Sequence, residues 1–519
     1  MRVPELAGRL GRTRTVALNG VDAHLVTVEA DIGPGLPGVH VVGMGDTAVR
    51  ESRDRIRTAV TNSGLDWPRT KIVVSMSPAD LPKAGSQFDL AMALAILSGA
   101  ERGRGEHRLR EAMVIGEIGL DGTVREVPGA LPAALAARAH GLDTVVVPPG
   151  NAAEASVLVS VEVLVAPTLS AAWDWARGYA ELPRAGRPGD SGGPGELRAG
   201  PAARVPDLAD VAGQPEARLA LEVAAAGGHH MMMVGPPGSG KSMLAERLPG
   251  ILPPLTEREM IEATVVHSVA AATGAGPVTR PPFVAPHHTV TRAALLGGGA
   301  GHPRPGAVSL AHRGGLFLDE VSEVPAAVLD GLRQPLETGE VHLLRSRSRV
   351  TLPAGFQLVL AANPCRCGAA EPAACRCSPA ERARYLNNLS GPLRDRLDIF
   401  VRTQATGTLS APAGESSAAV AERGAAARQR AHARWAGTGG AGRRVPGPVL
   451  RRRFPATEEA MALLEAFLAE GSVSQRGVDR TLRLAWTLAD LEEVARPGLD
   501  HVHRAVALHA PAADLQEAA

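Results

Sequence analysis

The stretch Gly235-Pro-Pro-Gly-Ser-Gly-Lys241-Ser242 decides the fold of this chain. It matches the pattern G-x-x-x-x-G-K-[ST], in which glycines let backbone N–H groups surround a phosphate. The apolar run Met231–Val234 precedes it, and a helical pattern over 242–248 follows it. The motif requires this strand–loop–helix order, and the helix start adds a favourable dipole. The sequence therefore predicts an α/β fold built around a phosphate-binding loop.

The phosphate loop, residues 235–242, offers a defined set of contacts for a nucleotide. Lys241 would reach the β- and γ-phosphates of ATP, and the hydroxyl of Ser242 would bind Mg²⁺. A glycine-rich turn before a core helix is the alternative, but one of the three lysines of the chain stands at the motif position. The predicted nucleotide-binding residues are Gly235, Pro236, Pro237, Gly238, Ser239, Gly240, Lys241 and Ser242.

Length and composition limit the class of protein. The 519 residues suggest about three domains, and a hydrophobic content of 45% is enough for packed cores. The net charge of +1 gives no overall field for nucleic acid or membrane, so any nucleic-acid contact must be local. Residues 1–6 lack the apolar core of a signal peptide, and the longest apolar run, 90–97, is too short to span a bilayer. We therefore expect a cytoplasmic protein without membrane contact.

Composition also changes along the chain. Ten of the nineteen residues from 183 to 201 are Gly or Pro, which is typical of a linker. Before it, strand patterns cover 15–18, 23–30, 71–76 and 144–148, and helix patterns cover 90–97 and 131–139. We predict a mixed α/β domain over 1–180, a linker over 181–204, a nucleotide-binding core over 205–402, a linker with a basic helix (415–435) over 403–452, and a helical domain over 453–519.

The second nucleotide motif is Gly315-Leu-Phe-Leu-Asp319-Glu320, an apolar strand that ends in two carboxylates. Asp319 would hold Mg²⁺, and Glu320 would act as general base on the attacking water. An apolar strand followed by Asp-Glu is also common in purely structural settings. Its position downstream of a phosphate loop favours the catalytic interpretation.

Two further polar positions follow apolar strands. Asn363 ends the run 356–362, where its amide can orient the attacking water beside the γ-phosphate. The loop 390–398 carries Arg394 and Arg396, and an arginine supplied to a neighbour's γ-phosphate stabilises transition-state charge. Each position alone would be interpreted as structural. Their order along the chain, after the phosphate loop and the Asp-Glu strand, indicates ATP hydrolysis.

All four cysteines lie within thirteen residues, in the pattern C-x-C-x₇-C-x-C. Four thiolates can bind Zn²⁺ tetrahedrally, and a closed ligand set favours a structural site. A reduced, metal-free loop is the alternative, because C-x-C pairs are less usual in zinc sites than C-x-x-C pairs. The candidate ligands are Cys365, Cys367, Cys375 and Cys377.

Two histidine pairs, His229-His230 and His287-His288, could suggest a further metal site. Adjacent side chains diverge in a strand, so neither pair would converge on one ion. We interpret both pairs as structural or pore-facing polar residues.

The chain resembles the Mg-chelatase-like AAA+ ATPases of the YifB/ComM type over nearly its whole length. The likeness rests on six stretches: DLADVAGQ (207–214), GHH (228–230), APHHT (285–289), RQPLE (333–337), ANPC (362–365) and SGPL (390–393). The resemblance implies a hexameric ring with ATP bound between subunits. It assigns Asn363 as sensor 1, Arg396 as the arginine finger with Arg394 as a less favoured substitute, and Arg476 as sensor 2 in a helical lid.

Residues 341–352 have the pattern of a β-hairpin with arginines at alternate positions, Arg345, Arg347 and Arg349. Alternate positions share one face of a strand. In related AAA+ helicases a hairpin before sensor 1 points into the ring pore, where arginines can contact nucleic-acid phosphates. A solvated edge strand protected by charge is an equally open interpretation.

The N-terminal region is similar to the proteolytic domain of Lon-type proteases over residues 78–89 and 116–131. Such enzymes need a serine nucleophile that a lysine activates. Gln87 stands at the serine position, and the family's Gly-Gly-x-Lys-x-Lys run is replaced by Gly-Ala-Leu-Pro-Ala-Ala over 129–134. Ser86 lies one residue away, which would direct its side chain elsewhere. We expect a Lon-like domain without peptidase activity that serves as a scaffold or guides DNA.

Together these features predict a P-loop AAA+ motor with a helical lid, preceded by a Lon-protease-like α/β domain. We expect an ATP-hydrolysing homohexamer that acts on single-stranded or branched DNA, with Mg²⁺ as cofactor and Zn²⁺ as a further candidate. The resemblance suggests branch migration in recombination or natural transformation. The alternative is a protein-remodelling ATPase, such as the motor subunit of a magnesium chelatase. The expected catalytic residues are Glu320, Asn363, Arg396 and Arg476.

Overall fold

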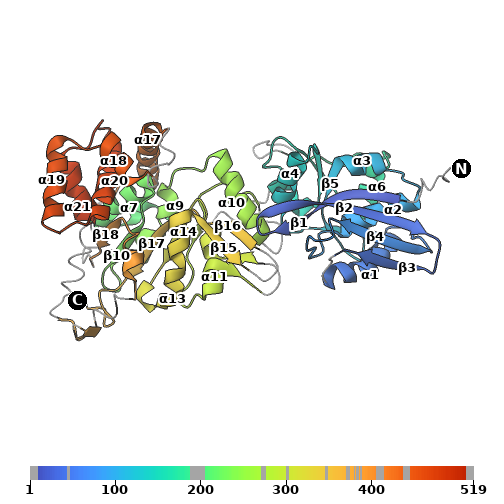
Figure 1. The fold of residues 1–519 in the computed structure, drawn as a ribbon, viewed down its shortest axis with the longest axis horizontal. Coiled ribbons are helices and arrows are strands. Elements are labelled where there is room, and N and C mark those ends of the chain that lie inside the picture. The colour runs from blue at the N-terminus through green and yellow to red at the C-terminus, as the bar shows by residue number, and fades with distance from the viewer. Residues whose placement is uncertain are drawn as a thin grey trace.

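Two lobes lie side by side along the long axis of the molecule (Figure 1). We call residues 10–186 the N-terminal module, residues 205–404 the central module and residues 414–509 the C-terminal helices. The C-terminal helices lie at the end of the central module that is far from the N-terminal module. The computed structural model describes residues 10–43, 47–186, 205–270, 276–299, 303–344, 349–369, 374–378, 380–381, 385, 388–404, 414–436 and 445–509.

A mixed seven-stranded sheet forms the N-terminal module, in the order β3-β4-β2-β1-β5-β8-β9. Its strands are β1 (Leu10–Asn19), β2 (Asp22–Gly33), β3 (Gly38–Val42), β4 (Lys71–Ser77), β5 (Ala112–Val114), β8 (Thr144–Val147) and β9 (Glu162–Val165), and β6 (Glu117–Ile118) pairs with β7 (Val124–Arg125) apart from it. The helices are α1 (Thr47–Asn62), α2 (Asp89–Ala100), α3 (Glu106–Glu111), α4 (Ala130–Ala139), α5 (Ala152–Ala155) and α6 (Leu169–Ala176), with the 3₁₀ turn η1 (Pro149–Asn151).

The hydrophobic pattern explains these elements. Along β2 alternate residues from Val26 to Ile32 are buried, as expected for a strand with one face on a core. α2 is apolar all round and is buried from Asp89 to Gly99, so it runs through the interior. The strand and helix patterns found in the N-terminal sequence are therefore confirmed as β1, β2, β4, β8, α2 and α4.

The central module is built on a five-stranded parallel sheet in the order β11-β14-β17-β10-β18. Its strands are β10 (Met231–Val234), β11 (Phe283–Val284), β14 (Gly315–Leu318), β17 (Gln357–Ala362) and β18 (Ile399–Arg402). Since all five run the same way, their carboxyl ends share one edge, the carboxyl edge, and their starts share the opposite amino edge. The strands expected at 231–234, 315–318 and 356–362 are confirmed.

Short helices and hairpins surround this sheet. They are η2 (Leu208–Asp210), α7 (Pro215–Gly227), α8 (Lys241–Ala245), α9 (Leu248–Ile251), α10 (Glu257–Ala270), α11 (Arg292–Leu296), β12 (Gly297–Gly298), β13 (Arg304–Pro305), α12 (Ala307–Leu310), η3 (Val321–Glu323), α13 (Ala326–Leu329), η4 (Asp330–Leu332), α14 (Arg333–Thr338), β15 (Glu340–Leu344), β16 (Arg349–Pro353) and α16 (Gly391–Arg394). The helix expected over 242–248 is divided into α8 and α9, because Pro249 cannot continue the hydrogen bonding of α8.

The C-terminal helices share one hydrophobic core with α7, β10 and β18. They are α17 (Ser417–Trp435), α18 (Gly447–Arg453), α19 (Glu458–Ala469), α20 (Gln475–Leu491) and α21 (Leu499–His509). The basic helix expected over 415–435 is thus confirmed as α17. Three of its arginines face the protein: Arg428 donates to the Ala225 and Ala226 carbonyls, Arg430 donates to the Asp490 carbonyl, and Arg434 pairs with the Asp490 carboxylate. These arginines bind carbonyl groups at helix ends and one buried carboxylate. They therefore do not form an exposed basic surface on α17.

The N-terminal module docks on α10 of the central module. The Gly129 N–H donates to the Ser268 carbonyl at 3.2 Å, and the Ser268 hydroxyl donates to the Glu154 carboxylate. Glu154 is only 1% exposed, and this burial raises its pKa to about 7. Around this polar contact, apolar residues of α10 pack against the N-terminal core: Met260, Ile261 and Val265.

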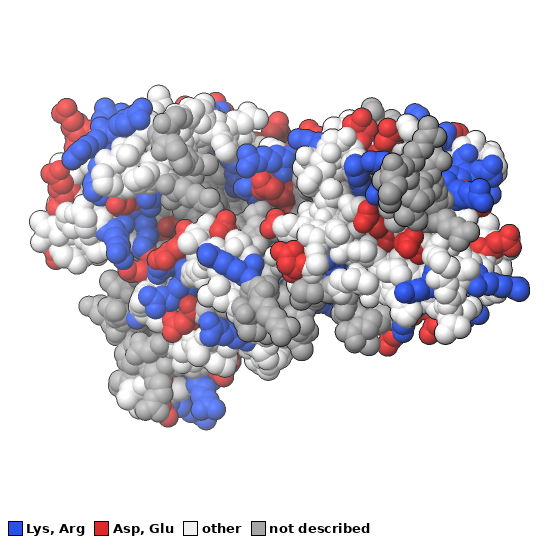
Figure 2. Space-filling model, turned by 45° about the vertical axis from the view of Figure 1, so that its right-hand side comes forward, with Lys and Arg blue, Asp and Glu red and all other residues white. Residues whose placement is uncertain are grey.

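Among the described residues, no helix is both long and apolar enough to cross a membrane. Figure 2 shows acidic and basic side chains interspersed over the face in view. This distribution matches the small net charge of +1.

Candidate nucleotide-binding site

Three strand ends meet at the carboxyl edge of the central sheet. β17 lies between β10 and β14, and all three run parallel. The phosphate loop follows β10, Asp319 and Glu320 follow β14, and Asn363 follows β17. The strand order therefore gathers motifs that are up to 122 residues apart in the chain.

Lys241 is held within the phosphate loop by neutral oxygen atoms. Its Nζ donates to the carbonyls of Gly235 at 2.7 Å and Pro236 at 2.9 Å, and to Oδ1 of Asn363 at 3.1 Å. Burial lowers the pKa of Lys241, against the opposing effect of the Asp-Glu carboxylates. An anionic phosphate would be a stronger partner for this ammonium group than the carbonyls that now hold it.

Ser242 and Asp319 form the second contact between motifs. The Ser242 hydroxyl donates to Oδ2 of Asp319 at 2.5 Å, while Oδ1 of Asp319 accepts from the Glu320 N–H at 2.8 Å. Hydroxyl and carboxylate oxygens are ligands that Mg²⁺ prefers. These two residues therefore fit a magnesium ion between them and the phosphates.

Glu320 has a strained backbone and a partner that the sequence did not reveal. Its φ of 47° and ψ of 43° are left-handed, a conformation that costs a non-glycine residue about 1–3 kcal/mol and often marks functional sites. Its Oε2 lies 3.0 Å from Nδ1 of His288, which follows β11 at the same edge. This contact gives His288, interpreted from the sequence as a structural or pore-facing polar residue, a defined partner in the candidate general base.

Residues outside the predicted set brace the phosphate loop. Gln214 donates to the Ser239 carbonyl at 2.8 Å and to the Gln404 carbonyl at 2.6 Å. The Ser239 and Thr403 hydroxyls are 2.7 Å apart. Gln214 has a φ of 58°, so a second non-glycine residue is held in the left-handed region beside the loop. The only sequence signal for Gln214 was its place at the end of the 207–214 stretch.

Tyr385 is another contact that sequence reasoning missed. Burial raises the pKa of Tyr385, while hydrogen bonds with Ser322 and Asn363 act in the opposite direction. Asn363 thus lies between Lys241 and this phenol. No motif in the sequence indicated that residue 385 returns to the carboxyl edge.

Arg396 lies away from the phosphate loop, near the amino edge. It precedes β18, and β18 runs parallel to β10, so this loop and the phosphate loop are at opposite ends of adjacent strands. Arg396 pairs with Glu337 of α14. Burial and three neighbouring arginines, Arg333, Arg476 and Arg480, lower the pKa of Arg396. Arg396 thus belongs to a cluster of cations.

Arg476 joins the same cluster. α20 begins just before it, where the Ser474 hydroxyl caps the helix by accepting from the Gly477 N–H. Arg476 is 80% exposed and lies 3.4 Å from Asp395, while Arg480 lies 3.8 Å from the buried Asp398. The structure therefore places Arg396 and Arg476 together, and it separates both from Lys241, Glu320 and Asn363.

The first histidine pair supports the amino edge, as the structural interpretation expected. Nε2 of His229 lies 2.8 Å from the Thr487 hydroxyl of α20, and Nδ1 of His230 accepts from the Leu358 N–H at 2.9 Å. Both histidines are 2% exposed. They tie α20 and the start of β17 to the start of β10.

The four cysteines converge just after Asn363. The sulfur of Cys365 lies 3.2 Å from that of Cys367 and 3.5 Å from that of Cys375, and all four ligand atoms lie within 4.8 Å of one another. Burial raises the pKa of Cys365, whereas the Arg376 N–H lowers that of Cys367. The cluster could hold a metal ion, and four sulfur ligands suit Zn²⁺.

The hairpin expected over 341–352 is confirmed as the antiparallel pair β15–β16. Of its three arginines, Arg349 is exposed, and Arg345 and Arg347 lie outside the described residues. A cleft of about 620 Å³ adjoins the hairpin between α11, α14 and β15, and Arg292, Arg333 and His342 are among its lining residues.

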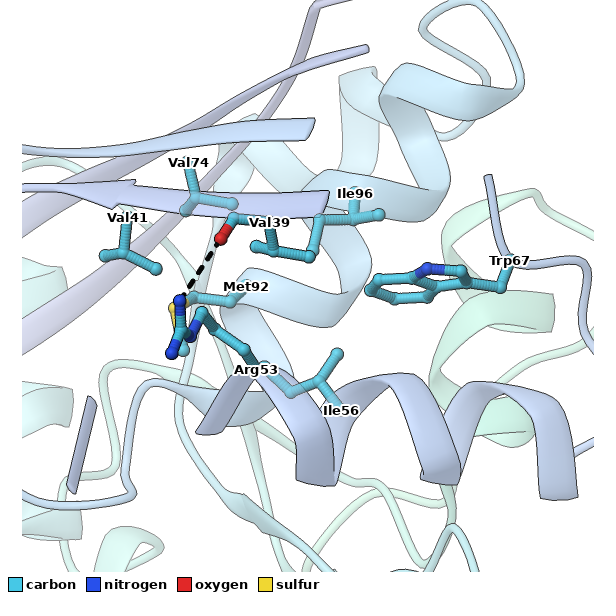
Figure 3. A pocket seen from close by; sticks show the side chains of 8 residues that line it. All are labelled: Val39, Val41, Arg53, Ile56, Trp67, Val74, Met92 and Ile96. Atoms are coloured by element: carbon cyan, nitrogen blue, oxygen red, sulfur yellow. Dashed lines mark hydrogen bonds between the residues drawn. The ribbon is translucent and has the colours of Figure 1, made fainter. Parts of the chain in front are cut away.

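In the N-terminal module, the residues around the expected protease position make other contacts. Gln87 donates to the Val16 carbonyl, Ser86 to the Glu117 carboxylate and Lys83 to the Pro78 carbonyl. An apolar cavity of about 10 Å³ lies among β3, β4, α1 and α2. Figure 3 shows the side chains that line it, among which Arg53 donates to the Val39 carbonyl, at 3.4 Å. Its lining contains neither serine nor lysine: Val39, Val41, Arg53, Ile56, Trp67, Val74, Met92 and Ile96.

Three family models match consecutive parts of the chain. The model described as "Magnesium chelatase, subunit ChlI" matches residues 207–410. The model described as "Subunit ChlI of Mg-chelatase" matches residues 28–151, and "Magnesium chelatase, subunit ChlI C-terminal" matches residues 414–509. The matches cover most of the N-terminal module, nearly all of the central module and the C-terminal helices.

Curated relatives align over almost the full length. An uncharacterized protein of Mycobacterium tuberculosis is 50% identical over 96% of this chain and 98% of the relative. Uncharacterized protein YifB of Escherichia coli is 39% identical over 96% and 97%. Competence protein ComM of Haemophilus influenzae is 37% identical over 91% of this chain and 92% of the relative. The chain belongs to the YifB/ComM-type Mg-chelatase-like family.

Proposed function

We propose that the protein is a motor that binds and hydrolyses ATP at the carboxyl edge of the central sheet. The observation that carries this proposal is the pair of contacts between motifs, Lys241 with Asn363 and Ser242 with Asp319. Lys241 would neutralise the β- and γ-phosphates, and Ser242 with Asp319 would hold Mg²⁺, which spreads the charge of the phosphates. Glu320 would accept a proton from the attacking water, and Asn363 would orient that water.

We infer further that hydrolysis needs a second subunit. Arg396 and Arg476 lie near the amino edge, so within one chain they do not share an end of the sheet with the phosphate loop. In a ring, this cluster would face the nucleotide of the next subunit, with Arg396 as arginine finger and Arg476 as sensor 2 of a helical lid. A homohexamer is the ring that the family resemblance implies.

DNA, single-stranded or branched, is the proposed substrate of the motor. A relative named as a competence protein, ComM, supports a role in competence, and branch migration in recombination or transformation is the activity that the family resemblance suggests. The exposed Arg349 and the cleft with Arg292 and Arg333 offer cations for phosphates beside the β15–β16 hairpin. We also propose a Lon-like N-terminal scaffold without peptidase activity, in line with Gln87 at the serine position.

A second candidate is a protein-remodelling motor similar to a magnesium chelatase subunit. The descriptions of all three matching family models name that subunit, including the model over residues 28–151. In this case a protein partner, and not DNA, would stimulate hydrolysis. The central sheet and its ATP site would be the same in both candidates.

The decisive experiment compares ATP hydrolysis by the full chain alone and with single-stranded, duplex and branched DNA. Lys241→Ala is the control, because it removes the phosphate contact and should lower nucleotide affinity at least about tenfold. Stimulation by DNA supports the first candidate, whereas stimulation only by a protein or tetrapyrrole partner supports the second. Undiminished ATP binding by Lys241→Ala would contradict the assignment of the phosphate loop.

A further inference from the structure

The cysteine loop touches the phosphate loop directly. Gly368, between the two cysteine pairs, has a φ of 68° and packs against the ring of Pro237. A Cβ at residue 368 would lie 2.8 Å from Cγ and 2.9 Å from Cδ of Pro237, closer than such atoms can approach. Glycine is therefore required at residue 368 for two reasons: the backbone conformation and the close contact with the phosphate loop.

The other end of the cysteine loop is also joined to the nucleotide site. Cys365 is buried and follows Asn363 by two residues, and Asn363 contacts Lys241. At the same strand end, the Ala362 carbonyl accepts from the Gly235 N–H at 3.2 Å. The phosphate loop is thus held from β17 on one side and by Gly368 on the other.

The sulfur positions fit a tetrahedral metal. With Zn–S bonds of about 2.3 Å, neighbouring sulfur atoms in a tetrahedron are about 3.8 Å apart. The sulfur atoms of Cys367 and Cys375 are 3.6 Å apart, those of Cys365 and Cys375 are 3.5 Å apart and those of Cys365 and Cys367 are 3.2 Å apart, while all four lie within 4.8 Å of one another. Without a metal no bond joins the four sulfur atoms, so the loop would lose the cross-link that closes it.

We propose that zinc at the four cysteines holds Gly368 against Pro237, so that metal occupancy sets the affinity of the phosphate loop for nucleotide. This inference rests on the proposed ATP site. Zinc would act as a structural support and would not touch the nucleotide. Its loss would free Gly368 from the cross-link among the four cysteines, and ordering Gly368 again on binding would cost affinity.

The first test measures zinc content and nucleotide affinity on the same full-length protein. A fluorescent ATP analogue is titrated into zinc-loaded protein, into protein stripped by a chelator that is then dialysed away, and into stripped protein with zinc restored. We expect about tenfold weaker binding after stripping and recovery with zinc, a fold-change equivalent to about 1.4 kcal/mol. Equal affinity in all three states, or protein without zinc that binds normally, would overturn the proposal.

Variants separate the metal from the contact. Gly368→Ala should keep zinc and still weaken nucleotide binding, whereas Cys377→Ser should lose both. Gly64→Ala is the matched control, because Gly64 has a φ of 72° but no atom within 4 Å of its added Cβ. Zinc-replete Gly368→Ala with wild-type affinity would refute the contact. If zinc-loaded wild-type protein binds no nucleotide at all, the proposed function fails instead.

Discussion

Two faces of the central module differ in how their polar groups are satisfied. On the face toward the N-terminal module, Glu154 is buried against Ser268, and apolar residues of α10 complete the contact. Near the amino edge, Arg476 is 80% exposed, and its acid partner Asp395 is 52% exposed. The first face is closed by the chain itself, whereas the second presents Arg476 with a weak, solvated partner beside the more covered Arg396 and Arg480.

This difference indicates where a second subunit is needed. A buried carboxyl that accepts hydrogen bonds already has its partners within the chain, so changing it alters the stability of the fold. An exposed cation in a cluster of cations contributes little within one chain, and it becomes strong only opposite an anion. A change at the open face should therefore have the largest effect, a change at the carboxyl edge a smaller one, and a change at the closed face the smallest.

Arg396→Ala should have the largest effect. An arginine finger accelerates phosphoryl transfer by about 10³-fold or more, so hydrolysis should fall by about that factor while ATP affinity stays unchanged. Single-turnover hydrolysis and equilibrium ATP binding measure the two quantities separately. Mixing Arg396→Ala with Lys241→Ala should restore some activity, because mixed interfaces can combine an intact loop with an intact finger. If subunits exchange and no mixture exceeds its parents, Arg396 does not act on a neighbour.

Glu320→Gln tests the carboxyl edge, where the nucleotide is proposed to bind. The amide keeps the size of the side chain but cannot accept the proton of the attacking water, so the turnover rate should fall about 10²–10³-fold. ATP should stay bound, and size-exclusion chromatography with ATP should show an accumulated assembly. Near-normal turnover would show that another group is the base.

His288→Ala should have a smaller effect, about tenfold on turnover. Glu320 is 49% exposed, and the contact with His288 at 3.0 Å restrains it, so the alanine variant loses the position of the base but keeps the base itself. Affinity for ATP should not change, and His288→Asn should have a turnover rate between those of His288→Ala and wild type. His287→Ala is the comparison, because it removes the Thr289 contact and the ring that lies 4.0 Å from that of His288 between centroids, but keeps the His288 side chain that contacts Glu320. Equal losses in both variants would indicate a general disturbance of this loop.

The sequence predicted what short segments and strand order determine. Each motif that follows an apolar strand, at Lys241, Asp319 and Asn363, lies at the carboxyl edge because parallel strands end together. The hairpin and α17 followed from local pattern in the same way.

Contacts between distant segments could not be predicted in this way. Nothing local places His288 beside Glu320, or Ser268 beside Glu154, because each pair depends on how separate elements pack. The basic pattern of α17 also gave no indication of which partners its arginines would take, and Arg434 pairs with a buried acid of α20. A pattern of charged residues predicts a helix more reliably than it predicts the partners that the charged side chains bind.

Glu154→Gln tests the closed face and should affect stability without affecting the chemistry. Burial raises the folded-state pKa of Glu154 to about 7, so between its ordinary pKa near 4.5 and pH 7 the folded protein binds more protons than the unfolded chain. Stability of wild type should therefore fall as pH rises through this window. The amide has no charge to bury, so the variant should match wild type at pH 4 and exceed it at pH 8 by at most about 3 kcal/mol. Denaturant midpoints at the two pH values measure this, with exposed Glu465→Gln as control. Parallel midpoints for wild type and variant across the window would mean that the Glu154 carboxyl does not titrate there, and that its burial against Ser268 makes no pH-dependent contribution to stability.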